Sequence, residues 1–137
     1  MLLVTMLFMV FSVKSQTLII DITNIRNANG KIIIGIFKND KNFQKEITYI
    51  DKTIDKSMLY NGSLTVKIEI KSGVYGVSIL DDENNDGNME YNFIGIPKEG
   101  FGFSNYYHSG IIKPKFEDFS FVIGKNNKKV KVKMKYM

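Results

Sequence analysis

Apolar and polar residues alternate in short segments along most of the chain. In residues 64–71, aliphatic side chains occupy every second position, and threonine, lysine and glutamate stand between them. A period of two is typical of a strand that buries one face, because successive side chains point to opposite sides of a sheet. The same period recurs in residues 18–22, 75–79, 119–123 and 130–136. Glycine, asparagine and aspartate separate these segments, so the chain is predicted to be all-β: an immunoglobulin-like or transthyretin-like antiparallel β-sandwich of about seven strands.

Asparagine and glycine mark the turns between the segments. Asn29-Gly30 is a strong hairpin signal, because both residues tolerate the positive φ angles of a type I′ turn. It predicts a hairpin that joins residues 18–22 to a strand at residues 31–37. Ser72-Gly73 and Asn126-Asn127 are predicted to turn the chain further along.

One segment has a different period. Phe43, Ile47, Ile50 and Ile54 follow one another at spacings of four, three and four. These spacings place side chains on one face of a helix rather than of a strand. The sequence therefore predicts one short helical segment between strands.

The first fifteen residues differ from the rest of the chain. They contain an apolar run of signal-peptide length that is too short to span a bilayer, and Val13 and Ser15 occupy the −3 and −1 places of a cleavage site. The pattern predicts a signal peptide over residues 1–15, a mature start at Gln16 and a single sandwich domain over residues 16–137. A short buried strand is the alternative for the apolar run.

The chain has no cysteine. It can form no disulfide, and it lacks the residue that would carry a bacterial lipoprotein anchor. A small exported domain without disulfides depends on its core or on a metal for stability. These properties favour a bacterial protein that is periplasmic or secreted and not membrane-anchored.

Charge is distributed unevenly, although the formal net charge is only +5. Acidic residues crowd the loop after residue 80, and lysines crowd the C-terminal end. The lysine stripe could bind anionic polymers or lipid head groups, or it could prevent edge-to-edge aggregation of an outer strand. It lacks the interleaved exposed aromatic residues that nucleic-acid binding requires, so no nucleic-acid partner is expected. The stripe consists of Lys125, Lys128, Lys129, Lys131, Lys133 and Lys135.

The acidic loop matches the calcium-loop pattern D-x-[DN]-x-[DN]-G over residues 82–87. Calcium takes six to eight oxygen ligands, and alternate residues of a tight turn can direct such ligands inward. Phe93 stands where an EF-hand has its bidentate glutamate, so the loop is predicted to be a calcium site between two strands; a solvated turn is the alternative. The predicted metal ligands are the side chains of Asp82, Asn84 and Asp86, the backbone carbonyl of Asn88, and Glu90 directly or through water.

Residues 100–108 place four aromatic side chains in a glycine-punctuated segment. Such rings could form an exposed platform for a sugar or a peptide, or they could close the end of the sandwich. A hydrolase triad of Ser104, His108 and Asp118 rests on composition alone. The sequence therefore predicts a protein that is not an enzyme.

Four motifs resemble the secreted bacterial family catalogued as domain of unknown function 2141. They are GVYGVS at 73–78, DDENNDG at 81–87, NFIGIPKEGFGFSN at 92–105 and FED at 116–118. The resemblance spans essentially the whole mature chain and implies an exported protein without an established activity. The acidic loop is also similar to calcium-bearing transthyretin-like or Cna-B-like modules of bacterial surface proteins, a likeness that would assign ligand roles to the same five residues.

These observations favour an exported, calcium-stabilised and non-enzymatic sandwich. Its expected role is that of a binding or accessory module at the cell envelope, with a protein or glycan partner. A metal-free structural or partner-binding sandwich is the alternative. A hydrolase acting on an envelope polymer is a third possibility, but the sequence contains no recognisable pair of nucleophile and base.

Overall fold

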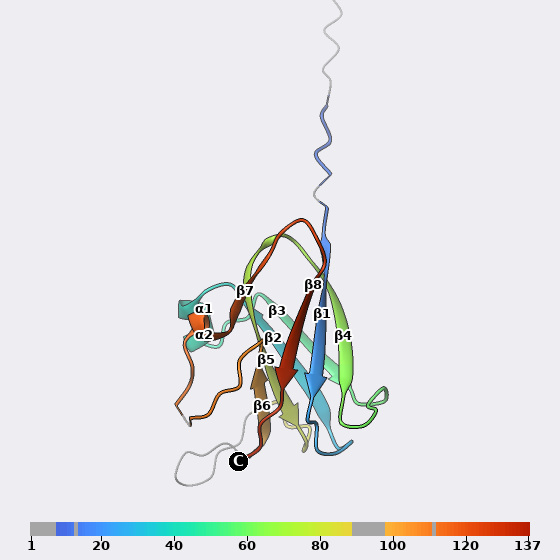
Figure 1. Cartoon of the computed structure of the whole chain (residues 1–137), viewed down its shortest axis with the longest axis vertical. Coiled ribbons are helices and arrows are strands. Elements are labelled where there is room, and N and C mark those ends of the chain that lie inside the picture. The colour runs from blue at the N-terminus through green and yellow to red at the C-terminus, as the bar shows by residue number, and fades with distance from the viewer. Residues whose placement is uncertain (1–7, 13, 89–97, 111) are drawn as a thin grey trace, which may run out of the picture.

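Two β-sheets pack face to face in the computed structural model, which describes residues 8–12, 14–88, 98–110 and 112–137 (Figure 1). The three-stranded sheet has the order β4 (Leu64–Ile70), β1 (Gln16–Thr23) and β8 (Lys128–Lys133). The five-stranded sheet consists of β3 (Ile50–Asp55), β2 (Lys31–Phe37), β5 (Gly73–Asp82) and β6 (Gly100–Phe103), with β7 (Ser120–Ile123) paired to the first half of β5. The predicted all-β sandwich is thus confirmed.

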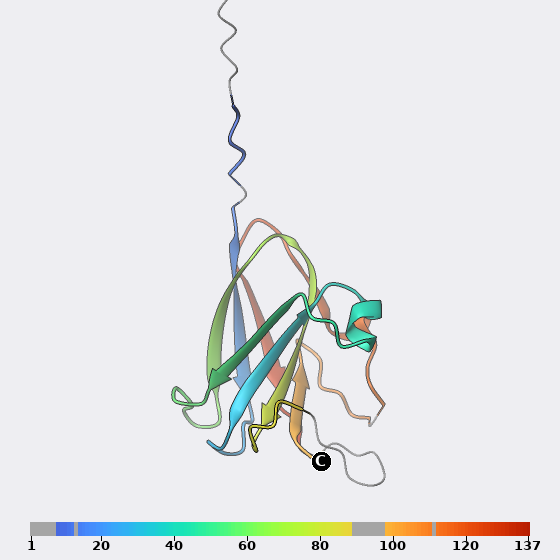
Figure 2. The ribbon, with the colours of Figure 1, turned by 180° about the vertical axis from the view of Figure 1, so that it is seen from behind.

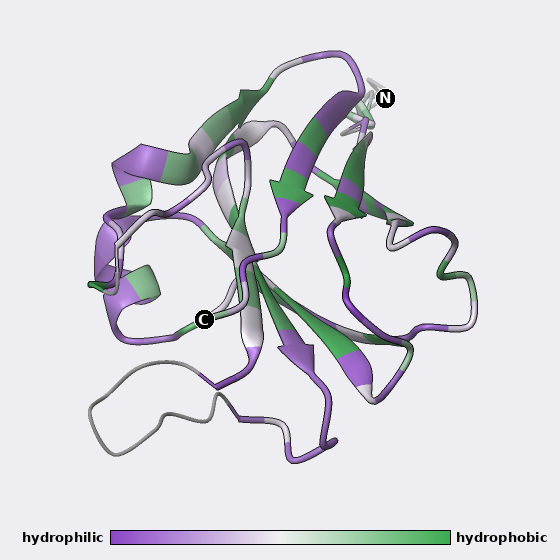
Figure 3. Cartoon of the chain, turned by 60° about the horizontal axis from the view of Figure 1, so that its bottom comes forward, coloured by the Kyte–Doolittle hydropathy of each residue, from purple (hydrophilic) through white to green (hydrophobic). Residues whose placement is uncertain are grey.

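The alternating residues form the interface between the sheets. In β4, each aliphatic side chain is buried and each polar one is exposed, and Figure 3 shows such hydrophobic and hydrophilic bands along the strands. Burying this apolar area is the main term that favours folding, at about 25 cal/mol per Å². The buried core includes Leu18, Ile20, Ile22, Ile32, Ile34, Ile36, Leu64, Val66, Ile68, Ile70, Tyr75, Val77, Ile79, Phe121, Val130 and Val132.

The predicted hairpin at Asn29-Gly30 is wrong. β1 pairs antiparallel with β4 and parallel with β8, whereas β2 pairs with β3 and β5. The turn therefore carries the chain from one sheet to the other, as do the connections β4–β5 and β7–β8. Two consecutive strands that each bury one face can do so across the sandwich as well as side by side, and the local sequence does not distinguish the two arrangements.

The predicted helical segment is only partly right. Helix α1 spans Asp40–Gln44, and the side chain of Asn39 caps it by accepting a hydrogen bond from the backbone N–H of Asn42. Ile50 and Ile54, however, lie in strand β3. A spacing of four puts two residues on the same face of a strand as well as of a helix, which explains the error.

A second hydrophobic cluster lies on the outer face of the five-stranded sheet. It is built from phenylalanines, and α1 and α2 (Phe116–Phe119) lie together beside β7 to complete it (Figures 1 and 2). At Gly76 in β5, an added Cβ would stand 2.6 Å from the Phe119 ring, so the glycine is needed for this close contact. Phe119 was predicted to begin a strand and instead ends α2. The cluster contains Phe37, Phe43, Phe101, Phe103, Phe116 and Phe119.

The apolar residues before the sandwich lie outside it. The side chains of Phe8, Met9, Val10 and Phe11 are exposed, and the chain leads away from the sheets at this end (Figure 1). The alternative of a buried strand is thus wrong for these residues. None of the helices in the described ranges is long and apolar enough to cross a membrane.

Candidate metal centre

The acidic loop follows the last residue of β5, Asp82, and lies at one end of the sandwich. The β5–β6 register pairs Asp81 with Gly100, so Glu99 is the residue that faces Asp82 across the two strands. The turn before β2 packs closely against the backbone at the start of the loop. At Gly30, whose φ is +72°, an added Cβ would lie only 1.9 Å from the carbonyl oxygen of Asp82, so no larger residue fits this contact.

Hydrogen bonds within the loop fold it around the Asp82 carboxylate. Its Oδ1 accepts the backbone N–H of Asp86 at 3.2 Å, and its Oδ2 accepts that of Gly87 at 2.9 Å. Asn85 and Gly87 have φ angles of 58° and 78°, in the left-handed region that asparagine and glycine tolerate best. The glycine of the calcium-loop pattern thus stands where the backbone reverses.

Three carboxylates converge at this point. Asp82, Asp86 and Glu99 each direct an oxygen to within 4.8 Å of the others. Asp82 and Glu99 are buried, and Asp86 is exposed. Carboxylate oxygens at this separation can share one divalent cation of the hard class, which would offset the repulsion among three negative charges.

The structure brings together part of the predicted ligand set. Asp82 and Asp86 are two of the three converging carboxylates. The Asn84 amide donates to Asp86 Oδ2 at 3.3 Å, and the backbone N–H of Asn88 donates to Asp86 Oδ1 at 2.9 Å, so both asparagines lie beside the cluster. Glu90 lies outside the described residues.

Glu99 was missed in the sequence, although it belongs to the motif at residues 92–105. Glu99 supplies a carboxylate from the residue directly before β6. The calcium-loop pattern instead takes all of its ligands from one contiguous loop, in which Phe93 occupies the position of the last ligand. The only available signal was an acidic residue directly before an aromatic strand. The pairing register that places it opposite Asp82 is a tertiary property.

The two acidic residues that flank Asp82 in the sequence, Asp81 and Glu83, bind basic side chains outside the cluster. Asp81 is fully buried and lies 2.5 Å from the Lys56 ammonium group, and its Oδ2 accepts the Tyr136 hydroxyl at 2.6 Å. Glu83 lies 2.6 Å from the Arg26 guanidinium and accepts a hydrogen bond from the side chain of Asn27 at 2.8 Å.

These contacts shift the pKa values of Glu83 and Tyr136. Burial alone would raise the pKa of Glu83, but the hydrogen bonds from Asn27 and Arg26 hold this pKa below its ordinary value. Burial and the hydrogen bond to Asp81 raise the pKa of Tyr136, so its hydroxyl stays protonated at neutral pH. Asp81 and Glu83 are thus paired with Lys56 and Arg26, and Asp82, Asp86 and Glu99 form the candidate metal cluster.

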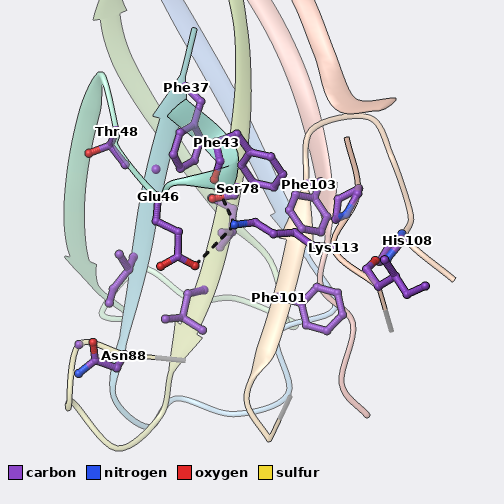
Figure 4. Close-up of a pocket in the computed structure, with 17 residues that line it drawn as sticks. Phe37, Phe43, Glu46, Thr48, Ser78, Asn88, Phe101, Phe103, His108 and Lys113 are labelled. Atoms are coloured by element: carbon purple, nitrogen blue, oxygen red, sulfur yellow. Dashed lines mark hydrogen bonds and ion pairs between the residues drawn. The ribbon is translucent and has the colours of Figure 1, made fainter. Parts of the chain in front are cut away.

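A cavity of about 470 Å³ opens on the outer face of the five-stranded sheet (Figure 4). Phenylalanines of the second cluster line it, Lys113 and Glu46 form a 3.6 Å ion pair beside it, and Asn88 of the acidic loop reaches its edge. Phe101 and Phe103 are buried against this face. They do not form an exposed platform, nor do they close the end of the sandwich.

The residues of the possible hydrolase triad are engaged elsewhere. Ser104 is buried; its Oγ donates to the carbonyl of Phe119 at 2.6 Å and accepts the backbone N–H of Val77 at 3.0 Å. The Asp118 carboxylate accepts the backbone N–H of Lys115. His108 contacts the hydroxyl of Tyr106 and the carbonyl of Ile112.

Comparison with known proteins identifies a family but no annotated relative. No curated protein and no solved structure matches the chain significantly. The model of the family described as "Uncharacterized protein conserved in bacteria (DUF2141)" matches residues 20–131, and the chain belongs to this family, as its motifs indicated.

Proposed function

We propose that the mature chain is an exported, non-enzymatic β-sandwich that one calcium ion stabilises, and that it acts as a binding or accessory module at the cell envelope. The observation that carries the proposal is the convergence of Asp82, Asp86 and Glu99 within 4.8 Å. The ion would connect the end of β5 to the start of β6. The expected partner is a protein or a glycan.

The ligand chemistry favours calcium over other metals. The converging groups are all carboxylates, with the Asn84 amide beside them, and hard cations prefer such oxygen ligands. Transition metals prefer sulfur and imidazole, but the chain has no cysteine and its only histidine, His108, contacts the carbonyl of Ile112. Magnesium demands stricter octahedral geometry and keeps its water more tenaciously, so a flexible loop suits it less well.

A metal-free sandwich is the second candidate. The observation that favours it is that the backbone N–H groups of Asp86 and Gly87 already bind the Asp82 carboxylate. A loop held by such bonds can keep its shape without an ion.

Two features support export. β1 begins at Gln16, the residue that would follow signal-peptide cleavage, and the apolar side chains of residues 8–11 are exposed to solvent. Mass analysis of the protein from its native host should give an N-terminus at Gln16 and a product free of the membrane. Retention of residues 1–15, or a membrane-bound product, would contradict the export proposal.

The engagement of Ser104 in two buried hydrogen bonds supports a non-enzymatic role, because its hydroxyl is committed to the fold. Turnover of an envelope polymer that disappears in His108→Ala would contradict this part of the proposal and favour a hydrolase.

Thermal unfolding with calcium and with chelator tests the metal. At a Kd on the order of 10⁻⁴ M, millimolar calcium adds about 1.4 kcal/mol to the free energy of unfolding and raises Tm by about 3–8 °C. Asp82→Ala and Asp86→Ala should each abolish this shift, and magnesium should give a smaller one. An unchanged wild-type melting curve, together with no calorimetric binding at millimolar calcium, would favour the metal-free sandwich.

A further inference from the structure

The outer face of the three-stranded sheet carries the C-terminal lysines. Lys129, Lys131 and Lys133 are exposed at alternate positions of β8, and β1 pairs with β8 so that Asp21 lies beside Lys131 and Thr23 beside Lys133. Alternate residues of a strand are about 6.6 Å apart, so the three lysines stand in a regular line along one face of the sheet. We call this surface the lysine face.

Protection of a strand edge does not explain the whole lysine face, because other residues already cover part of the free edge of β8. Asn105 donates its backbone N–H to the carbonyl of Lys131 at 2.7 Å and accepts the Lys131 N–H through its side chain at 3.0 Å. Phe101 and Lys135 exchange two backbone hydrogen bonds of 3.0 and 2.8 Å. Lysines are one way to prevent pairing at an open edge, but here the backbone groups of Lys131, in the middle of the edge, and of Lys135 beyond it are already bound.

Acidic groups within the fold neutralise only part of the charge on the lysine face. Lys129 lies 3.1 Å from the Asp21 carboxylate and keeps 60% of its side chain exposed. Within the described ranges, no acidic side chain forms an ion pair with Lys131 or Lys133, and the Lys133 ammonium lies 4.9 Å from the ring centre of Tyr107. Positive charge is thus left available to a ligand.

We propose that the lysine face binds a linear acidic polysaccharide. A line of lysines complements a chain of regularly spaced anionic groups, and the Thr23 hydroxyl on the same face can bond to sugar hydroxyls. The hydroxyls of Thr17 and Thr65 already donate to Glu69 and Asp21. The acidic loop lies outside this face. Of the two acidic residues on the face, Asp21 is paired with Lys129, and Glu69 accepts hydrogen bonds from Ser15 and Thr17.

Two other polyanions fit the surface less well. Apolar side chains that insert would strengthen binding to a membrane surface, but the exposed large apolar residues of the described chain lie outside β1, β4 and β8. A nucleic acid would require aromatic rings for stacking, and the ring of Tyr107 is already contacted by Lys133 and Lys135.

Binding of the mature protein to polygalacturonate, with neutral dextran as the comparison polymer, tests the proposal. The measurement is made in EDTA, because calcium cross-links polygalacturonate. Lys131→Gln with Lys133→Gln should weaken binding by about tenfold or more and reduce its salt dependence, since two ammonium contacts with polymer carboxylates are lost. Lys41→Gln with Lys45→Gln removes the same charge from exposed positions at α1 and should leave binding close to that of the wild type.

Equal affinity of the wild-type protein and the Lys131/Lys133 variant would overturn the proposal, as would an equal loss in the Lys41/Lys45 variant. Tighter binding to oligothymidylate or to phosphatidylglycerol vesicles than to polygalacturonate would overturn it in favour of those ligands. Since EDTA removes calcium, the outcome is independent of the metal centre, which the melting experiments test separately.

Discussion

One carboxylate oxygen of Glu99, directly before β6, lies within 4.8 Å of one from Asp82, the last residue of β5. Two carboxylates from neighbouring strands thus lie close together at the point where the acidic loop leaves the sheet. If calcium bridges the two groups, the ion holds both ends of the loop segment, and its ligands come from distant parts of the sequence.

The first prediction concerns Glu99. Glu99→Gln should abolish the calcium-dependent rise in Tm, because an amide is a much weaker ligand for a hard cation than a carboxylate. Glu83→Gln is the matched control: it removes the same charge one residue after Asp82, but Glu83 binds Arg26 and Asn27 instead of facing the cluster. The control should lower the baseline stability and retain the calcium shift. A full shift in Glu99→Gln would remove Glu99 from the ligand set.

The second prediction concerns the register of β4. Ile68 is buried in the core, and Lys67 beside it is exposed on the opposite face. Ile68→Ala should reduce the free energy of unfolding by about 2–5 kcal/mol, and Lys67→Ala by less than about 0.5 kcal/mol. Urea unfolding measures both values. Similar losses at the two positions would mean that the register of β4 is wrong.

The positions of the alternating strands could be predicted from the sequence, because a strand that buries one face needs apolar side chains at every second residue, whereas β3 was expected to be helical. Residues 64–70 show this success. Residues 31–37 also match a strand, although they do not alternate and were expected only as the continuation of the Asn29-Gly30 turn. Sheet membership could not be predicted, because Asn29-Gly30 permits a turn without specifying whether the next strand pairs or packs. The parallel pairing of β1 with β8 joins the two ends of the domain and has no local signal.

The candidate metal centre was predictable only where its residues are contiguous. Asp82 and Asp86 belong to one local pattern that reflects the oxygen preference of calcium. Glu99 reaches the cluster through strand pairing. Lys56 is buried because it pairs with Asp81, a residue distant from it in the sequence. Both depend on contacts that form only after the sheets assemble.

The third prediction concerns pH. Asp40 accepts the backbone N–H of Phe116 at 2.9 Å and the Gln44 amide at 3.1 Å, and these hydrogen bonds, that of Phe116 first, lower its pKa. A carboxyl whose folded pKa is depressed contributes stability above its unfolded pKa of about 3.9 and loses it as pH falls through the folded value. Asp40→Asn should therefore be less stable than the wild type at pH 7, with the difference shrinking below pH about 4.

Thermal melts of both proteins between neutral and acidic pH measure this effect. Asp51→Asn, at an exposed position of β3, removes a carboxylate without breaking a bond between α1 and α2, and serves as the control. A stability difference between the wild type and Asp40→Asn that stays constant across the range would show that the Asp40 charge does not hold the two helices together.

The last prediction concerns the ion pair of Lys56 and Asp81, which lies within the sandwich directly behind the acidic loop. Both side chains are almost fully buried, and Lys56 also donates to the carbonyl of Asn27 at 3.2 Å. Removing one partner leaves an uncompensated buried charge, so Lys56→Met should cost about 3–5 kcal/mol in urea unfolding. Lys56→Met combined with Asp81→Asn removes both charges, keeps an acceptor for the Tyr136 hydroxyl and should recover much of this loss. The exposed pair of Lys129 and Asp21 gives the comparison, since Lys129→Met should cost less than about 1 kcal/mol. If Lys56→Met costs no more than Lys129→Met, or if the double variant is less stable than the single one, the pair is not a buried, mutually compensating pair in solution.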